Sequence, residues 1–128
     1  MSGSGARAIL LVDDEETIRG TAGRVLRRAG YIVFTAASAE EAGEIWTRES
    51  GSIGLLVTDV ELGGVDGVTF ASRCLEDCPG LPVVLTSGYA AAELRATRPV
   101  PEACQFLAKP FTAIELVEAV RPLLESSP

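Results

Sequence analysis

The stretch AILLVDDEE, residues 8–16, joins an unbroken apolar run to four consecutive acids. Apolar runs of similar length recur along the chain, at Ile32–Ala36, Ile53–Thr58, Pro82–Thr86 and Cys104–Ala108. Such short, nearly continuous runs are typical of strands that are buried on both faces, as in a parallel sheet. We therefore expect five strands, the first at Ala8–Val12 with acids where it ends.

Amphipathic segments separate these runs. Apolar residues recur at helical spacing over residues 18–29, and Gly30 then provides a stop. Ser38 and Glu41 form a capping-box pattern that opens a second helix. A third helix is expected at Gly67–Cys78.

The last two helices differ in strength of signal. A segment of good helix-forming residues begins at Ala90, but Pro99 and Pro101 should end this helix after about two turns. Thr112 and Glu115 form a second capping box and open the last helix. The β-α unit thus occurs five times, which predicts an α/β fold with a five-stranded parallel, doubly wound sheet and helices on both sides. We expect a flexible lead-in at residues 1–6, one domain at 7–125 and a short tail at 126–128.

The composition narrows the classes of function. The 128 residues carry a net charge of −7, which disfavours binding to nucleic acid or to anionic membrane. Apolar runs are too short to span a bilayer. The three cysteines are an odd number, which fits free thiols in the cytoplasm. Apart from Lys109, all basic residues are arginine, and we expect these arginines to face water.

Polar residues collect where the strands end. Asp13 and Asp14 follow the first strand, Asp59 the third, Ser87 the fourth and Lys109 the fifth. Ligands of open α/β sheets bind beyond the carboxyl ends of the strands. Taken singly, the acids could cap a helix or belong to ordinary loops. Taken together, they repel one another unless a cation is bound, and oxygen ligands select Mg²⁺, with Mn²⁺ possible.

A lysine beside such an ion is suited to phosphoryl transfer, because both neutralise the charge of the transferred group. A nucleotide-binding Rossmann or flavodoxin site is not favoured. It needs a loop of glycines or hydroxyls after the first strand, and this chain has acids there.

Four segments together resemble the receiver domain of two-component response regulators: LLVDDEE, VTDVELGGVDG, VVLTSGYA and FLAKPF. They occur in the same order and spacing as in that family, and the resemblance covers roughly residues 7–125. The resemblance implies a flavodoxin-like (βα)5 fold with strand order 2-1-3-4-5, here with a shortened fourth helix. It also implies a phosphorelay domain that takes phosphate from a histidine kinase or a histidine phosphotransfer domain.

The resemblance assigns a role to each matching residue. Asp59 corresponds to the phosphoacceptor, and Asp13 and Asp14 correspond to the acids that hold Mg²⁺ with it. Lys109, whose bond to the following proline is cis in the family, and Ser87 correspond to the residues that contact the phosphoryl group.

The remaining roles are a further metal contact, a switch and the tuning of phosphoryl lifetime. Glu61 corresponds to the residue that offers a backbone carbonyl to the metal. Ser87 and Phe106 correspond to the switch pair. Glu61 and Tyr89 occupy the positions that tune phosphoryl lifetime, and Tyr89 is expected to shield the phosphate from water.

The chain departs from the family pattern in three places. Leu62 and Gly63 replace Met and Pro after the phosphoacceptor, which predicts a more flexible loop. Phe106 replaces the commoner tyrosine, so that any rotamer switch would depend on packing alone. The short fourth helix makes dimerisation through that helix, the fifth strand and the fifth helix doubtful, and the oligomeric state stays undetermined.

Several functions remain open at this point. The segments are similar to receivers at the C-terminus of hybrid sensor histidine kinases, and a free single-domain response regulator is the alternative. A receiver-like interaction module that takes up no phosphate is a further alternative. A phosphatase of the haloacid dehalogenase type is disfavoured, because it needs a second aspartate where this chain has Glu61. In either receiver setting the domain assists its own phosphorylation and acts as a signalling module.

Overall fold

The computed structural model describes residues 7–125, and the expected lead-in and tail lie outside the described residues. Its main sheet has five parallel strands, β1 (Ala8–Val12), β2 (Ile32–Ala36), β3 (Ile53–Asp59), β6 (Val83–Ser87) and β7 (Gln105–Ala108). Their spatial order is β2-β1-β3-β6-β7. This is the expected order 2-1-3-4-5, because β4 and β5 form a separate two-stranded sheet.

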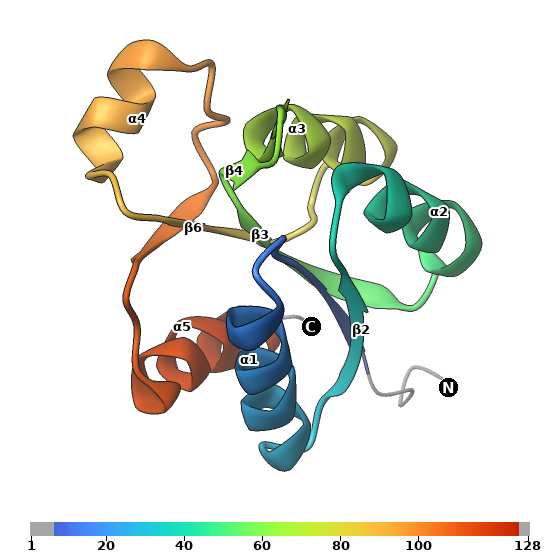
Figure 1. Ribbon diagram of the computed structural model, residues 1–128. Helices are drawn as coiled ribbons and strands as arrows, with labels where there is room; N and C mark the ends of the chain where they lie inside the picture. The colour runs from blue at the N-terminus through green and yellow to red at the C-terminus, as the bar shows by residue number, and fades with distance from the viewer. Residues whose placement is uncertain (1–6, 126–128) are drawn as a thin grey trace.

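Five helices cover the two faces of the sheet (Figure 1). They are α1 (Glu16–Arg28), α2 (Ala39–Glu49), α3 (Gly67–Asp77), α4 (Ala91–Thr97) and α5 (Ala113–Glu125). α1 and α5 lie on one side, and α2 and α3 lie on the other. Within residues 7–125 no helix has the length and apolar character needed to cross a bilayer.

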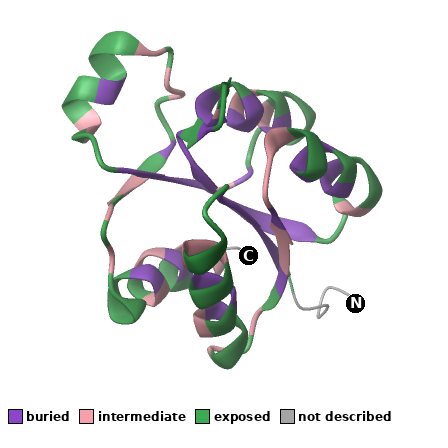
Figure 2. Ribbon diagram, in the orientation of Figure 1, coloured by how far each residue is buried: buried purple, intermediate pink, exposed green. Residues whose placement is uncertain are grey.

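The core lies on both faces of the sheet, as the continuous apolar runs predict. On β1, Leu10 and Val12 pack toward α2 and α3, and Ile9 and Leu11 pack toward α1 and α5. The central strands are accordingly buried along their length (Figure 2). β1 and β3 therefore hold their carboxyl ends in fixed positions, and these ends carry Asp13 and Asp59.

The helix caps form as the sequence indicates. The hydroxyl of Ser38 accepts a hydrogen bond from the amide of Glu41 at 3.1 Å. At the start of α5 the bonding is reciprocal: Thr112 accepts from the amide of Glu115 at 3.1 Å, and the Glu115 carboxylate accepts from the amide of Thr112 at 2.9 Å. α4 has seven residues, which is the short helix that Pro99 predicts.

One element was not expected. The segment after Asp59 forms an antiparallel hairpin, β4 (Glu61–Leu62) and β5 (Val65–Asp66). Gly63 and Gly64 have φ of 59° and 103°, and positive φ at both central residues is what a two-residue type I′ turn requires. Leu62 is buried in the core and anchors the hairpin. The two glycines in this segment therefore form the turn of the hairpin.

Candidate functional site

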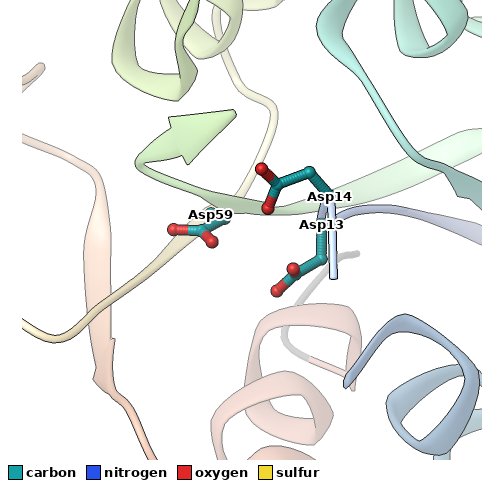
Figure 3. A group of neighbouring side chains, drawn as sticks. All are labelled: Asp13, Asp14 and Asp59. Carbon is teal, nitrogen blue, oxygen red and sulfur yellow. The ribbon is translucent and has the colours of Figure 1, made fainter. Parts of the chain in front are cut away.

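The order of the strands in the sheet brings three acids together at its carboxyl edge. Asp13 and Asp14 directly follow β1, and Asp59 ends β3, the neighbouring strand. One carboxylate oxygen from each lies within 4.8 Å of the others. Figure 3 shows the three carboxylates gathered in one place. The crowding of acids that the strand ends predict is therefore present in the structure.

Lys109 reaches into this group from the end of β7. Its Nζ lies 2.7 Å from an Asp59 oxygen and 2.9 Å from an Asp13 oxygen. Burial alone would lower the pKa of Lys109, but hydrogen bonds to Asp59 and Asp13 and their negative charges outweigh it, so the pKa is raised. The lysine is therefore a permanent cation between two buried carboxylates. Its bond to Pro110 is cis, as the resemblance implies.

The other carboxylate oxygens are oriented by nearby backbone amides. Asp13 accepts a hydrogen bond from the amide of Glu15 at 2.9 Å, and Asp59 accepts from the amide of Glu61 at 3.1 Å. The Asp14 carboxylate has no hydrogen bond or ion pair with any residue between 7 and 125. An exposed, unpaired carboxylate beside two others is a donor set that suits a hard divalent cation, so the residues fit Mg²⁺.

Gly67 fixes where the backbone of Asp59 lies. A Cβ at this position would overlap the carbonyl oxygen of Asp59, so the first residue of α3 has to be glycine. The amide of Gly67 also donates to the carbonyl of Val60 at 2.6 Å. α3 therefore begins in direct contact with the strand end that carries Asp59.

Ser87 lies on β6, the strand beside that of Asp59, and Phe106 lies on β7, one strand further along the sheet. Asp59 pairs with Thr86 in the sheet, so Ser87 is one residue further toward the same edge. Its hydroxyl is buried and accepts a hydrogen bond from the amide of Tyr89 at 2.8 Å, while the side chain of Tyr89 is exposed. Phe106 lies on β7 opposite Leu85 and is half-buried.

Two arginines of the α4 region make contacts that the sequence analysis does not predict, although Arg95 is exposed as expected. Arg95 stacks over the ring of Phe106 at 5.0 Å, so packing is not the only interaction on this ring. Arg98 is mostly buried and pairs with Asp66. The expectation that the arginines face water is therefore wrong for Arg98, because an acidic hairpin lies within its reach.

A cavity of about 600 Å³ opens beside Asp59. Its lining combines acids of the site with the hairpin and one cation, and comprises Asp14, Glu15, Asp59, the residues from Val60 to Asp66, and Arg98. Arg98 is the residue of this lining that the sequence motifs miss. The sequence signal for the place of Arg98 is the dipeptide Arg98-Pro99, because proline disfavours the helical conformation for the residue before it.

Comparison with known proteins identifies the family of this chain. The family model of the response regulator receiver domain matches residues 9–121, and the chain belongs to this family. The sensor kinase CckA of Brucella abortus is 34% identical over 95% of this chain, which spans 13% of that protein. The response regulator receiver protein CpdR of the same organism is 31% identical over 92% of this chain and 97% of its own length.

A solved structure agrees as well. The receiver domain of the hybrid histidine kinase CckA has a TM-score of 0.77 and 36% identity, over 91% of this chain and 98% of the other. The protein is thus a receiver domain of two-component signalling, with the CheY-like fold. Receiver domains generally bind Mg²⁺ in an acidic pocket and interact with histidine kinases or phosphotransfer proteins, and this chain has a group of three aspartates at the carboxyl edge of its sheet.

Proposed function

We propose that this domain takes a phosphoryl group from a phosphohistidine onto Asp59 and changes conformation in response. The observation that carries the proposal is the contact of 2.7 Å between Lys109 and Asp59 beside two further aspartates. A carboxylate held next to a cation at the open edge of the sheet is a nucleophile for phosphoryl transfer.

The reaction forms one bond and breaks one. A carboxylate oxygen of Asp59 attacks phosphorus, the N–P bond of the donor breaks, and the histidine nitrogen takes the electron pair. The product is an acyl phosphate. Lys109 neutralises charge on the transferred oxygens, and the amide of Glu61 orients the carboxylate. Mg²⁺, held by Asp13, Asp14, Asp59 and the backbone carbonyl of Glu61, would neutralise further charge when bound.

The conformational change involves Ser87 and Phe106. In this proposal the Ser87 hydroxyl leaves the amide of Tyr89 and donates to the phosphoryl group, and Phe106 moves into the space that opens. Tyr89 shields the acyl phosphate, with Glu61 also setting its lifetime. Replacement of Tyr89 by alanine should therefore accelerate dephosphorylation, and an unchanged rate would contradict this role.

The setting is also part of the proposal. We favour the C-terminal receiver of a hybrid sensor histidine kinase in the cytoplasm, supported by the similarity to CckA and by the free thiols. A single-domain response regulator is the second candidate, because CpdR matches over nearly its whole length. The length of the complete gene distinguishes the two.

The test is intact mass after incubation with Mg²⁺ and acetyl phosphate, and separately with a phosphorylated histidine phosphotransfer domain. The parent should gain one phosphoryl group, while Asp59→Asn and samples with EDTA should gain none. If the parent gains nothing from either donor, the domain is either an interaction module that takes up no phosphate or a receiver that depends strictly on its cognate donor. A gain in Asp59→Asn would place the acceptor elsewhere.

A further inference from the structure

Arg98 leaves the end of α4 in a direction set by its neighbours. Its amide donates to the carbonyl of Leu94 at 2.9 Å, which ends the helix. Pro99 disfavours the helical conformation for the residue before it, and Arg98 is extended, with φ −140° and ψ 150°. The side chain therefore leaves the helix and reaches the hairpin that follows Asp59.

There Arg98 joins two acids of the hairpin. Its Nε donates to Asp66 at 3.0 Å, and its terminal nitrogen lies 3.9 Å from Glu61. Glu61 and Asp66 are opposite one another in the β4–β5 pair, where like charges are destabilising. The side chains of Arg98 and Asp66 are 25% and 34% exposed, so this pair is shielded more than a surface pair, whereas the Glu61 side chain is 62% exposed.

The same hairpin contacts the phosphoacceptor. Glu61 donates its amide to an Asp59 carboxylate oxygen at 3.1 Å. Asp66 accepts from the amide of Val68 at 2.7 Å and so caps α3, whose first residue packs on the backbone of Asp59. A shift of the hairpin therefore moves both the amide on Asp59 and the support behind it.

We propose that Arg98 is a positioning residue for the Asp59 site, which holds the acidic hairpin in place so that the Glu61 backbone contacts Asp59. This inference rests on the proposed phosphorylation and adds a route by which α4 and the site affect each other. Without Arg98 the two acids repel, the hairpin moves away from the site, and phosphorylation slows. The phosphorylated site in turn changes the position of α4 through the same ion pair.

The test compares Arg98→Gln, Arg98→Lys and the parent, with Arg48→Gln as the matched control, since Arg48 is exposed on α2 and pairs only with Glu49 among residues 7–125. One readout is the rate of phosphorylation by acetyl phosphate at saturating Mg²⁺. The other is hydrogen exchange of the Glu61 and Val68 amides, measured by NMR without a phosphodonor. A partly buried pair predicts about a two- to fivefold slower rate for Arg98→Gln.

Exchange at both amides should accelerate in Arg98→Gln, while Arg98→Lys should lie between that variant and the parent and Arg48→Gln should match the parent. Asp66→Asn tests the same ion pair from its acidic side, because asparagine still caps α3 but carries no charge. Adding Arg98→Gln to Asp66→Asn should then have little further effect.

Two results would overturn the inference. One is an Arg98→Gln variant whose phosphorylation rate and amide exchange equal those of the parent. The other is a double variant, Arg98→Gln with Asp66→Asn, whose loss of rate equals the product of the two single losses. If the parent takes up no phosphate, the proposed function fails, but amide exchange still decides whether Arg98 positions the hairpin.

Discussion

Lys109 contacts the same carboxylates that would hold a metal ion. Its Nζ contacts Asp13 and Asp59, two of the three acids that would hold Mg²⁺. Replacing it with glutamine removes a cation from a crowded acidic group. We expect Lys109→Gln to bind Mg²⁺ several-fold more tightly and to lose about 1–3 kcal/mol of stability without Mg²⁺, because two buried carboxylates lose their partner.

Calorimetric titration with Mg²⁺ and urea unfolding with and without the ion test this expectation. Lys109→Arg keeps the charge and serves as control, with Mg²⁺ affinity nearer to that of the parent. An affinity of Lys109→Gln equal to or weaker than that of the parent would show that the lysine and the metal do not compete.

Gly67 provides a second prediction for a single residue. Because a Cβ there would overlap the Asp59 carbonyl, Gly67→Ala should displace the strand end and cost about 2–4 kcal/mol of unfolding free energy. Gly20, in the exposed part of α1, has no atom within 4 Å of the place that a Cβ would take. Gly20→Ala should therefore stabilise the protein by about 0.5–1 kcal/mol. Thermal and urea unfolding of both variants test this pair, and equal effects would argue against a close approach at Gly67.

The caps of the helices determine stability at the scale of the element. Thr112 and Glu115 exchange hydrogen bonds at the start of α5, a few residues after Lys109. Loss of the hydroxyl in Thr112→Ala should cost about 1 kcal/mol, while Thr112→Ser keeps the hydroxyl and should stay within a few tenths. Urea unfolding measures the difference. If alanine and serine have the same effect, the capping hydrogen bond contributes nothing measurable.

The short α4 shows how two elements are joined without a long interface. Arg95 donates to the carbonyls of Glu102 and Cys104 and stacks on Phe106, while Arg98 pairs with the hairpin. Arg95 thus connects α4 to β7, and Arg98 connects the end of α4 to the hairpin after Asp59. The helix is therefore linked to Phe106 of the proposed switch and to the hairpin that follows Asp59.

For the whole molecule, the cysteines report how completely the core excludes solvent. Cys74 and Cys104 are buried, and burial raises the pKa of both thiols, that of Cys74 to about 12. Cys78 is exposed. We expect iodoacetamide at pH 8 to label Cys78 in the folded protein and all three cysteines in denaturant.

The raised pKa of Cys74 also makes the stability of the protein depend on pH. Between its ordinary value of 9.0 and about 12, the unfolded thiol loses its proton while the folded one keeps it. The free energy of unfolding should therefore fall as the pH rises through this window.

The labelling of the cysteines by iodoacetamide is measured by peptide mapping. Equal labelling of Cys74 and Cys78 without denaturant would show that the core opens readily.

The sequence alone determined the strands, the caps and the acidic edge of the sheet, since these depend on short-range patterns. The apolar run of Ala8–Val12 is a strand at the expected bounds, and the alternation of elements requires Asp13, Asp59 and Lys109 to meet where parallel strands end. The rest depends on where separate segments lie in space. Arg98 and Asp66 are 32 residues apart, and their pairing follows from the end of α4 lying beside the hairpin. The need for glycine at Gly67 likewise arises only when α3 packs on the backbone of Asp59, because a steric overlap between two segments leaves no periodicity in either one.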